Sequence, residues 1–281
     1  MKTIIRFHSR LQLLLHLLVL VSVPAAAVDT QFMQGIGDSR YHHLESTVIG
    51  RGFHIYVMLP AGYDPEDSQE YPTVYVLDGG SLFPLFAAYY RYLNFGEEIP
   101  AAIIVGISYG TADFAAGNFR STDYTAPSVE RDYWGGAENF QSFLSDELFP
   151  VIEAGYRSDA GQRIVFGQSI GGQFVLYTAL TRPDLFWGHI ASNPALHRNL
   201  PFFLERHGTY EPGSERSKLF VGSGTLDDPQ YREPAQAWIR HWTGEENRPW
   251  QLKTMHLDGH THMSAPPASF RQGMHWLFSE D

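Results

Sequence analysis

The sequence predicts an α/β fold with a mainly parallel central sheet and helices on both faces. Short, continuous apolar runs, typical of strands buried on both faces, alternate with segments that have helical spacing of apolar residues. One of these runs leads directly into a serine flanked by glycines, and an apolar helical segment follows it. These observations place the chain among proteins whose functional residues lie at the ends of parallel strands.

The serine stands in the segment Gly167-Gln168-Ser169-Ile170-Gly171, directly after the β-rich run 164–166. A residue on a sharp strand-to-helix turn needs small neighbours two positions before and after it, and Gly167 and Gly171 meet this requirement. The buried helix predicted at 174–180 has its first amides directed at the same place. This arrangement is the nucleophile elbow of the α/β-hydrolase fold, which exposes Ser169 at the carboxyl edge of the sheet.

The other elements follow from periodicity and turn residues. A long segment rich in Gly, Ser, Thr, Asp and Tyr, 108–136, is predicted to be a surface loop with a binding or lid role. Further strands are predicted at 47–49, 53–60, 72–77, 101–107, 188–192, 219–222 and 251–257. Further helices are predicted at 83–92, 137–156, 195–206, 233–242 and 270–278.

The first 27 residues have the pattern of a secretory signal peptide. A basic start with Lys2, Arg6 and Arg10 precedes a hydrophobic run, and Ala25-Ala26-Ala27 supplies small residues for cleavage. The run is shorter than the roughly 20 residues that a bilayer requires, and no later stretch is apolar enough to span one. We therefore expect residues 28–281 to form one domain without stable membrane insertion, in the periplasm or outside the cell.

Charge and cysteine content exclude several classes of function. Removal of residues 1–27 takes away three basic residues and no acidic ones, so the formal net charge changes from -11 to -14. Such an acidic chain is a poor partner for nucleic acids or anionic membranes. Cysteine is absent, which excludes thiol catalysis, disulfides and cysteine-ligated metal sites. No cofactor is expected.

Serine becomes an effective nucleophile when a histidine removes its proton and an acid orients that histidine. After Ser169 an acid and a histidine follow in this order, each just past a predicted strand: Asp227, with Asp228 as its rival, and His262, with His260 as its rival. Together with His256, the two histidines could suggest a metal site. No partner stands at ligand spacing and His256 lies within a strand, so no metal is predicted.

Acyl transfer also requires hydrogen-bond donors for the developing oxyanion. The backbone N–H of Ile170, directly after the nucleophile, is the first candidate. The second is expected after the strand 72–77, where Gly79 and Gly80 let the backbone approach closely, and Gly80 is preferred.

Several motifs resemble the esterase D and enterochelin-esterase-like family of α/β-hydrolases. They are the elbow, Val76-Leu77-Asp78-Gly79, the helix from Glu138 to Pro150 with Tyr156-Arg157 after it, and the ending His262-Met263-Ser264 to Ser269-Phe270-Arg271. The resemblance extends from about Thr47 to the end. It implies Ser169 as nucleophile, His262 as base and Asp227 as acid, although some relatives work with a Ser–His dyad.

Two departures from the family concern residues near the site. Gln168 replaces the histidine that often precedes the nucleophile. The segment Arg120-Ser121-Thr122-Asp123-Tyr124-Thr125-Ala126-Pro127 resembles R-x-x-D-Y-T-P with one extra residue. From this loop, Arg120, Tyr124 and Trp134 are candidate substrate-binding residues. Arg120 is the arginine of the resembling motif, and the aromatic side chains could stack on the catechol rings of a siderophore.

The sequence therefore predicts an exported serine hydrolase that cleaves carboxylic esters of small molecules, with a periplasmic siderophore trilactone as one substrate class. A general short-chain acyl esterase is the alternative within this class. A non-catalytic binding protein with a hydrolase shell, or acyl transfer to an acceptor other than water, would use the same residues. The oligomeric state is not predicted.

Overall fold

The structure is a computed structural model that describes residues 33–36, 39–205 and 217–279. The predicted signal peptide lies outside the described residues. Among the described residues, no helix is both long enough and apolar enough to cross a bilayer.

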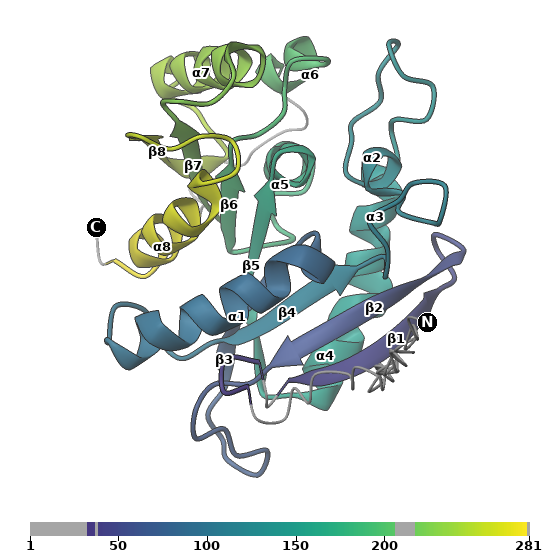
Figure 1. Ribbon diagram of the computed structural model, residues 1–281, viewed down its shortest axis with the longest axis vertical. Helices are drawn as coiled ribbons and strands as arrows, with labels where there is room; N and C mark the ends of the chain where they lie inside the picture. The colour runs from purple at the N-terminus through teal and green to yellow at the C-terminus, as the bar shows by residue number, and fades with distance from the viewer. Residues whose placement is uncertain (1–32, 37–38, 206–216, 280–281) are drawn as a thin grey trace, which may run out of the picture.

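A single eight-stranded sheet runs through the molecule in the order β1-β2-β4-β3-β5-β6-β7-β8 (Figure 1). β2 is antiparallel to β1 and β4, and the other neighbours are parallel. The strands are β1 (Arg40–Ser46), β2 (Arg51–Met58), β3 (Tyr71–Val76), β4 (Ile103–Ser108), β5 (Ser158–Gln168), β6 (Gly188–Ser192), β7 (Ser217–Gly224) and β8 (Trp250–Leu257). The predicted mainly parallel sheet is confirmed.

Helices cover both faces of this sheet (Figure 1). On one face, α1 packs mainly over β4 and α8 over β6 and β7, and the rings of Phe86, Phe166 and Phe270 meet between them. On the other face, α3, α4, α5 and α7 cover a larger core. The helices are α1 (Gly79–Phe95), α2 (Arg120–Asp123), α3 (Ala137–Phe143), α4 (Phe149–Gly155), α5 (Ile170–Thr181), α6 (Leu200–Leu204), α7 (Pro229–Gly244) and α8 (Ala265–Leu277).

The buried strands match the predicted ranges within a few residues. The edge strand β1 does not match the strand predicted at 47–49. Residues 47–49, predicted as a strand, belong to the turn after β1, in which the Gly50 N–H donates to the Ser46 carbonyl at 2.9 Å. The Glu147 carboxylate accepts bonds from the Thr47 and Val48 amides and so fixes this turn. β1 is mostly exposed and rich in polar residues, so hydrophobic patterning did not reveal it.

One predicted helix is confirmed and another differs from the structure. The helix predicted at 137–156 is one continuous helical run made of α3, a π-helical segment Leu144–Leu148, and α4, which has Pro150 in its first turn. The helix predicted at 195–206 is reduced, among the described residues, to the short α6. The first residues of the predicted helix instead form hydrogen-bonded loop structure next to Ser169.

The predicted long loop 108–136 is partly core. It contains α2, and Tyr124 and Ala126 have no exposed surface. The ring of Tyr124 packs edge-on against Phe140 of α3, with centroids 5.0 Å apart. The segment is therefore fixed to the body of the domain at this point, and aromatic residues such as Phe114 and Tyr133 remain exposed.

One buried group makes the fold sensitive to acid. His189 in β6 has no exposed surface, and burial lowers its pKa to about 3, with a contact to the Lys218 backbone opposing part of this effect. Above the ordinary histidine pKa of about 6.5, both the folded and unfolded states hold the ring neutral. Below it, only the unfolded chain binds the proton, so acid favours unfolding.

We therefore predict that the free energy of unfolding falls between about pH 6.5 and pH 3, with a share on the order of a few kcal/mol from His189. His189→Leu should flatten this part of the profile. Urea unfolding of both proteins at several pH values measures the difference. Parallel profiles would contradict the prediction.

Candidate active site

The predicted site residues follow the carboxyl ends of parallel strands, which meet at one edge of the sheet. Ser169 follows β5, Asp227 follows β7, and His262 follows β8. Asp78 and Gly80 follow β3, at the start of α1. Because these strands are neighbours in the sheet, residues far apart in the sequence reach one cavity.

Ser169 occupies the turn between β5 and α5 with φ 60° and ψ -115°, a conformation that L-residues rarely adopt. Its backbone is held on both sides. Its N–H donates to the Ser192 carbonyl at 3.0 Å, and its carbonyl accepts from Ala195 N at 3.0 Å and Gln173 N at 2.9 Å. The strained turn predicted by the glycine spacing is present.

The histidine and the acid form a direct pair. His262 Nδ1 lies 2.8 Å from Asp227 Oδ2, and the other carboxylate oxygen accepts the Asp228 N–H at 2.7 Å. Asp227 is only 3 % exposed. A buried carboxylate at this distance fixes the tautomer of the ring, so that Nε2 is the nitrogen free to accept a proton.

The rival residues have other roles. Asp228 caps α7 by accepting the Gln230 N–H at 2.9 Å. His260 Nδ1 contacts the Ser264 carbonyl at 2.9 Å within its own loop. The structure therefore pairs His262 with Asp227. Among the described residues, no group of three or more His, Asp or Glu side chains is arranged to hold a metal ion.

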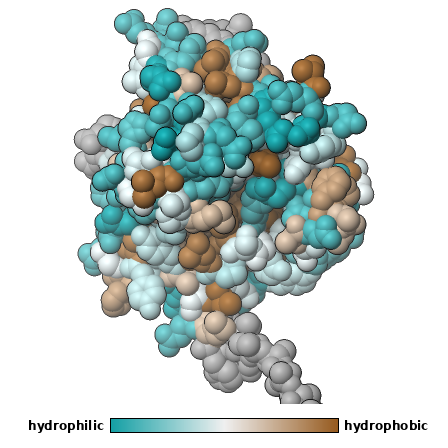
Figure 2. Space-filling model, turned by 45° about the horizontal axis from the view of Figure 1, so that its top comes forward, coloured by the Kyte–Doolittle hydropathy of each residue, from teal (hydrophilic) through white to brown (hydrophobic). Residues whose placement is uncertain are grey.

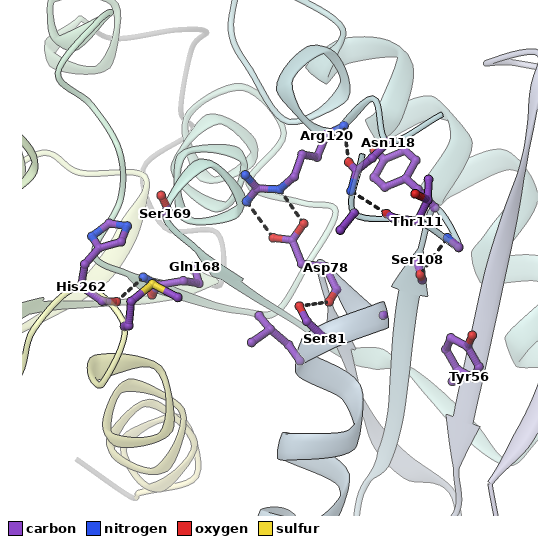
Figure 3. Close-up of a pocket in the computed structure, with 16 residues that line it drawn as sticks. Tyr56, Asp78, Ser81, Ser108, Thr111, Asn118, Arg120, Gln168, Ser169 and His262 are labelled. Atoms are coloured by element: carbon purple, nitrogen blue, oxygen red, sulfur yellow. Dashed lines mark hydrogen bonds and ion pairs between the residues drawn. The ribbon is translucent and has the colours of Figure 1, made fainter. Parts of the chain in front are cut away.

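Ser169 and His262 line the same cavity, which has a volume of about 640 Å³ (Figure 3). This size falls within the range of about 300–1,000 Å³ typical of small-molecule sites. Ser169 and His262 lie together at one side, and Tyr56 and Ser108 lie at the other. The face drawn in Figure 2 is mostly hydrophilic, with hydrophobic residues in small separate groups. The remaining lining includes Gly80, Ser81, Leu82, Tyr109, Thr111, Asn118, Gln168 and Met263.

The candidate oxyanion donors belong to the first turns of two helices, where amides have no partner within the helix. Ile170 is the first residue of α5, and Gly80 is the second residue of α1. Gly80 lines the cavity. Both residues therefore stand at positions where a backbone N–H has no partner within its helix.

Arg120 and Asp78 form a bidentate ion pair in this cavity (Figure 3). Arg120 Nε lies 2.7 Å from Asp78 Oδ1, and Nη2 lies 2.8 Å from Oδ2. Burial alone would lower the pKa of Arg120, and the Asp78 carboxylate outweighs burial and raises it. The pair connects α2 to the start of α1, so the Arg120 loop and the Gly80 amide are held together.

The structure separates the three candidate substrate-binding residues. Arg120 lines the cavity, whereas Tyr124 is buried in the core and Trp134 is outside the cavity lining. Tyr124 therefore has no surface that a substrate could contact. A compositional argument about an aromatic loop could not distinguish a core ring from an exposed one.

Two residues to which the sequence assigned no role hold the histidine loop. Gln168 donates through Nε2 to the His262 carbonyl at 2.7 Å, and Asn193 donates to the Thr261 and His262 carbonyls at 3.3 Å each. Both are polar residues at the carboxyl end of a buried strand. A polar residue at the end of a buried strand was the signal in the sequence that could have identified them as part of the site.

A model of the family described as "Putative esterase" matches residues 46–275. The chain belongs to this esterase family. The ferri-bacillibactin esterase of Bacillus subtilis is 36% identical over 171 residues, which cover 56% of this chain and 58% of that protein. The apo-salmochelin esterase of Escherichia coli is 28% identical over 208 residues, which cover 68% of this chain and 64% of that protein. The matches thus span about three fifths of these curated relatives.

The crystal structure of the BES protein from Bacillus cereus superimposes on this esterase family member with a TM-score of 0.71. The superposition covers 85% of this chain and 94% of that chain at 24% identity. Together with the family match, it confirms the predicted α/β-hydrolase fold.

The packing of the elbow predicts a position at which a single methyl group is not tolerated. A Cβ added at Gly167 would lie 2.9 Å from Gly172 N and closer still to the Gly171 carbonyl. We expect Gly167→Ala to lower the free energy of unfolding by at least about 2 kcal/mol, because backbone rather than a flexible side chain must move. Gly155→Ala is the matched control, since nothing lies within 4 Å of its added Cβ. Thermal and urea unfolding of the two variants test this, and equal stability would contradict it.

Proposed function

We propose that this protein is an exported serine hydrolase that cleaves the ester bonds of siderophores through an acyl-enzyme on Ser169. The observation that carries the proposal is the convergence of Ser169 and the His262–Asp227 pair on one cavity. The family of the chain and the siderophore esters named for its curated relatives support the reaction and the substrate class.

In the proposed mechanism, Ser169 Oγ attacks the ester carbonyl while His262 Nε2 takes the hydroxyl proton. The carbonyl oxygen becomes an oxyanion that accepts hydrogen bonds from the Ile170 and Gly80 amides. When the tetrahedral intermediate collapses, the C–O bond to the alcohol breaks and His262 returns the proton to the leaving oxygen. Water then attacks the acyl-enzyme with the same base, and the carboxylic acid leaves Ser169.

Asp227 stabilises the charged states of this cycle. Its carboxylate is nearly fully buried and lies against His262 Nδ1, so the positive imidazolium forms beside an existing negative charge. Among the hydrogen bonds of the described residues there is none between Ser169 and His262. In enzymes of this kind, the contact between nucleophile and base often tightens only when substrate is bound.

The cavity suits an ester larger than a simple acetyl ester. Its volume of about 640 Å³ exceeds what a short acyl chain fills, and hydroxyl and amide side chains contribute to its lining. Arg120 presents a planar guanidinium with N–H groups beyond the two engaged by Asp78, and we propose that it contacts polar substrate oxygens. We assign no substrate contact to Tyr124 or Trp134.

Export is supported by the signal-peptide pattern of residues 1–27, and the absence of cysteine is compatible with it. Hydrolysis would then take place in the periplasm or outside the cell.

The nucleophile can be tested with a fluorophosphonate probe. We expect the wild-type protein to be labelled on Ser169, located by peptide mass spectrometry, and the folded Ser169→Ala variant to remain unlabelled. A folded, unlabelled wild-type protein would support a binding protein with a hydrolase shell. Turnover of a catecholate trilactone beside p-nitrophenyl esters of increasing chain length then tests the substrate class. A preference for acetyl or butyryl esters would favour the general esterase.

The two neighbouring aspartates provide a matched pair of variants. Asp227→Asn should lower kcat by roughly 10³- to 10⁴-fold, since the amide no longer holds His262 in the productive tautomer. Asp228→Asn should leave kcat unchanged, because asparagine also caps helices. Steady-state kinetics on a p-nitrophenyl ester measure both. An Asp227→Asn enzyme with nearly full activity would indicate a Ser–His dyad.

A further inference from the structure

The segment Ser192–Ala195, directly after β6, lies between the nucleophile turn and the two loops that carry the acid and the base. Ser192 and Ala195 hold the backbone of Ser169, through the Ser192 carbonyl and the Ala195 N–H. Asn193 stands between them, and its own hydrogen bonds reach the end of β7 and the histidine loop.

Asn193 reaches the strand that leads to the acid. Its backbone N–H donates to the Gly222 carbonyl at 2.8 Å, and its side-chain Oδ1 accepts the Gly224 N–H at 2.7 Å. The Gly224 carbonyl in turn accepts the Asp227 N–H at 3.3 Å. The side chain of Asn193 is thus two hydrogen bonds away from the backbone of Asp227.

The same side chain also reaches the histidine loop. Asn193 Nδ2 lies 3.3 Å from both the Thr261 and the His262 carbonyl oxygens. The His262 carbonyl accepts a second bond, from Gln168 Nε2 at 2.7 Å (Figure 3). The backbone of His262 is therefore held by two residues, Gln168 at the end of β5 and Asn193 directly after β6.

The amide side chain of Asn193 satisfies both kinds of partner. The Gly224 N–H requires an acceptor, and the two loop carbonyls require a donor, which asparagine supplies on one short side chain. The residue is 1 % exposed and has φ 40°, a left-handed conformation that asparagine tolerates better than most residues. Aspartate would direct an oxygen at the carbonyl groups, and alanine would leave all three groups without this partner.

We infer that Asn193 is a positioning residue that sets the spacing of Ser169, Asp227 and His262. The inference rests on the proposed function. It assigns to one buried side chain the task of connecting the loop of the acid to the loop of the base. The backbones of its neighbours Ser192 and Ala195 hold Ser169 beside them. A displacement of about 1 Å in such a site costs on the order of 10²-fold in rate.

The test uses Asn193→Gly, which accepts the left-handed backbone and removes only the side chain, and Asn193→Asp, which keeps the shape and replaces the donor. For both, we expect kcat on a p-nitrophenyl ester to fall by about 30- to 100-fold with KM within about twofold. The effect should be partial, since the Gln168 bond to His262 remains. Asn94→Ala is the control: Asn94 near the end of α1 also donates to a loop carbonyl, that of Ile99, and its loss should leave kcat unchanged.

A double-mutant cycle separates positioning from general destabilisation. If Asn193 acts through the His262–Asp227 pair, Asn193→Gly should cost much less in the Asp227→Asn background than alone. Multiplicative effects, or a kcat within threefold of wild type in Asn193→Gly, would overturn the inference.

A readout that does not require activity distinguishes this inference from the proposed function. The proton shared by His262 Nδ1 and Asp227 gives a downfield proton NMR resonance, which Asp227→Asn assigns by its loss. We expect Asn193→Gly to weaken or broaden it while Asn94→Ala preserves it, even if no ester is turned over. An unchanged resonance in folded Asn193→Gly would refute the positioning role, whereas absent labelling of the wild type would refute the proposed function alone.

Discussion

The strained turn at Ser169 is the constraint on which the rest of the site depends. A serine with φ 60° and ψ -115° costs on the order of 1–3 kcal/mol, and such a conformation persists only where the surroundings hold it. Here the backbone of the turn is bound on both sides by Ser192, Ala195 and Gln173. Glycine at position 167 removes the side chain that would otherwise collide with α5. Strand β5, helix α5 and the segment after β6 therefore have to be in place before the serine can be presented to the cavity.

Parallel strands explain why the other groups arrive at the same point. β3, β5, β6, β7 and β8 run in the same direction, so the residues that follow them emerge at one edge. Each supplies a different element: an amide at the start of α1, the serine, a buried asparagine, a buried acid and a histidine. The order of strands in the sheet places the asparagine next to both the serine and the acid. This placement lets one short side chain contact several loops.

Two carboxylates near the cavity, those of Asp227 and Asp78, are each paired with a basic side chain. Asp227 is paired with His262 and with a backbone amide, and Asp78 is paired with Arg120. Desolvated carboxylates without such partners would be costly, and removing one partner would leave a buried charge. The pairs thus fix loop positions as well as charges. The Asp78–Arg120 pair connects the segment that contains Gly80 to α2.

The sequence by itself determined the alternation of strands and helices, the turn at Ser169, and the order of serine, acid and histidine. These depend on local rules: apolar runs identify buried strands, and small residues at fixed spacing identify a sharp turn. The exposed strand β1 was not predicted from the sequence, because its polar residues give no such pattern. Only the tertiary structure decided between Asp227 and Asp228 as partner of His262. The side chains of adjacent residues point in different directions, and these directions depend on how β7 ends and α7 begins. It also decided that Tyr124 is a core residue and that Asn193 joins the end of β7 to the histidine loop. Burial and contacts between distant segments depend on the packing of the sheet rather than on neighbours in the chain.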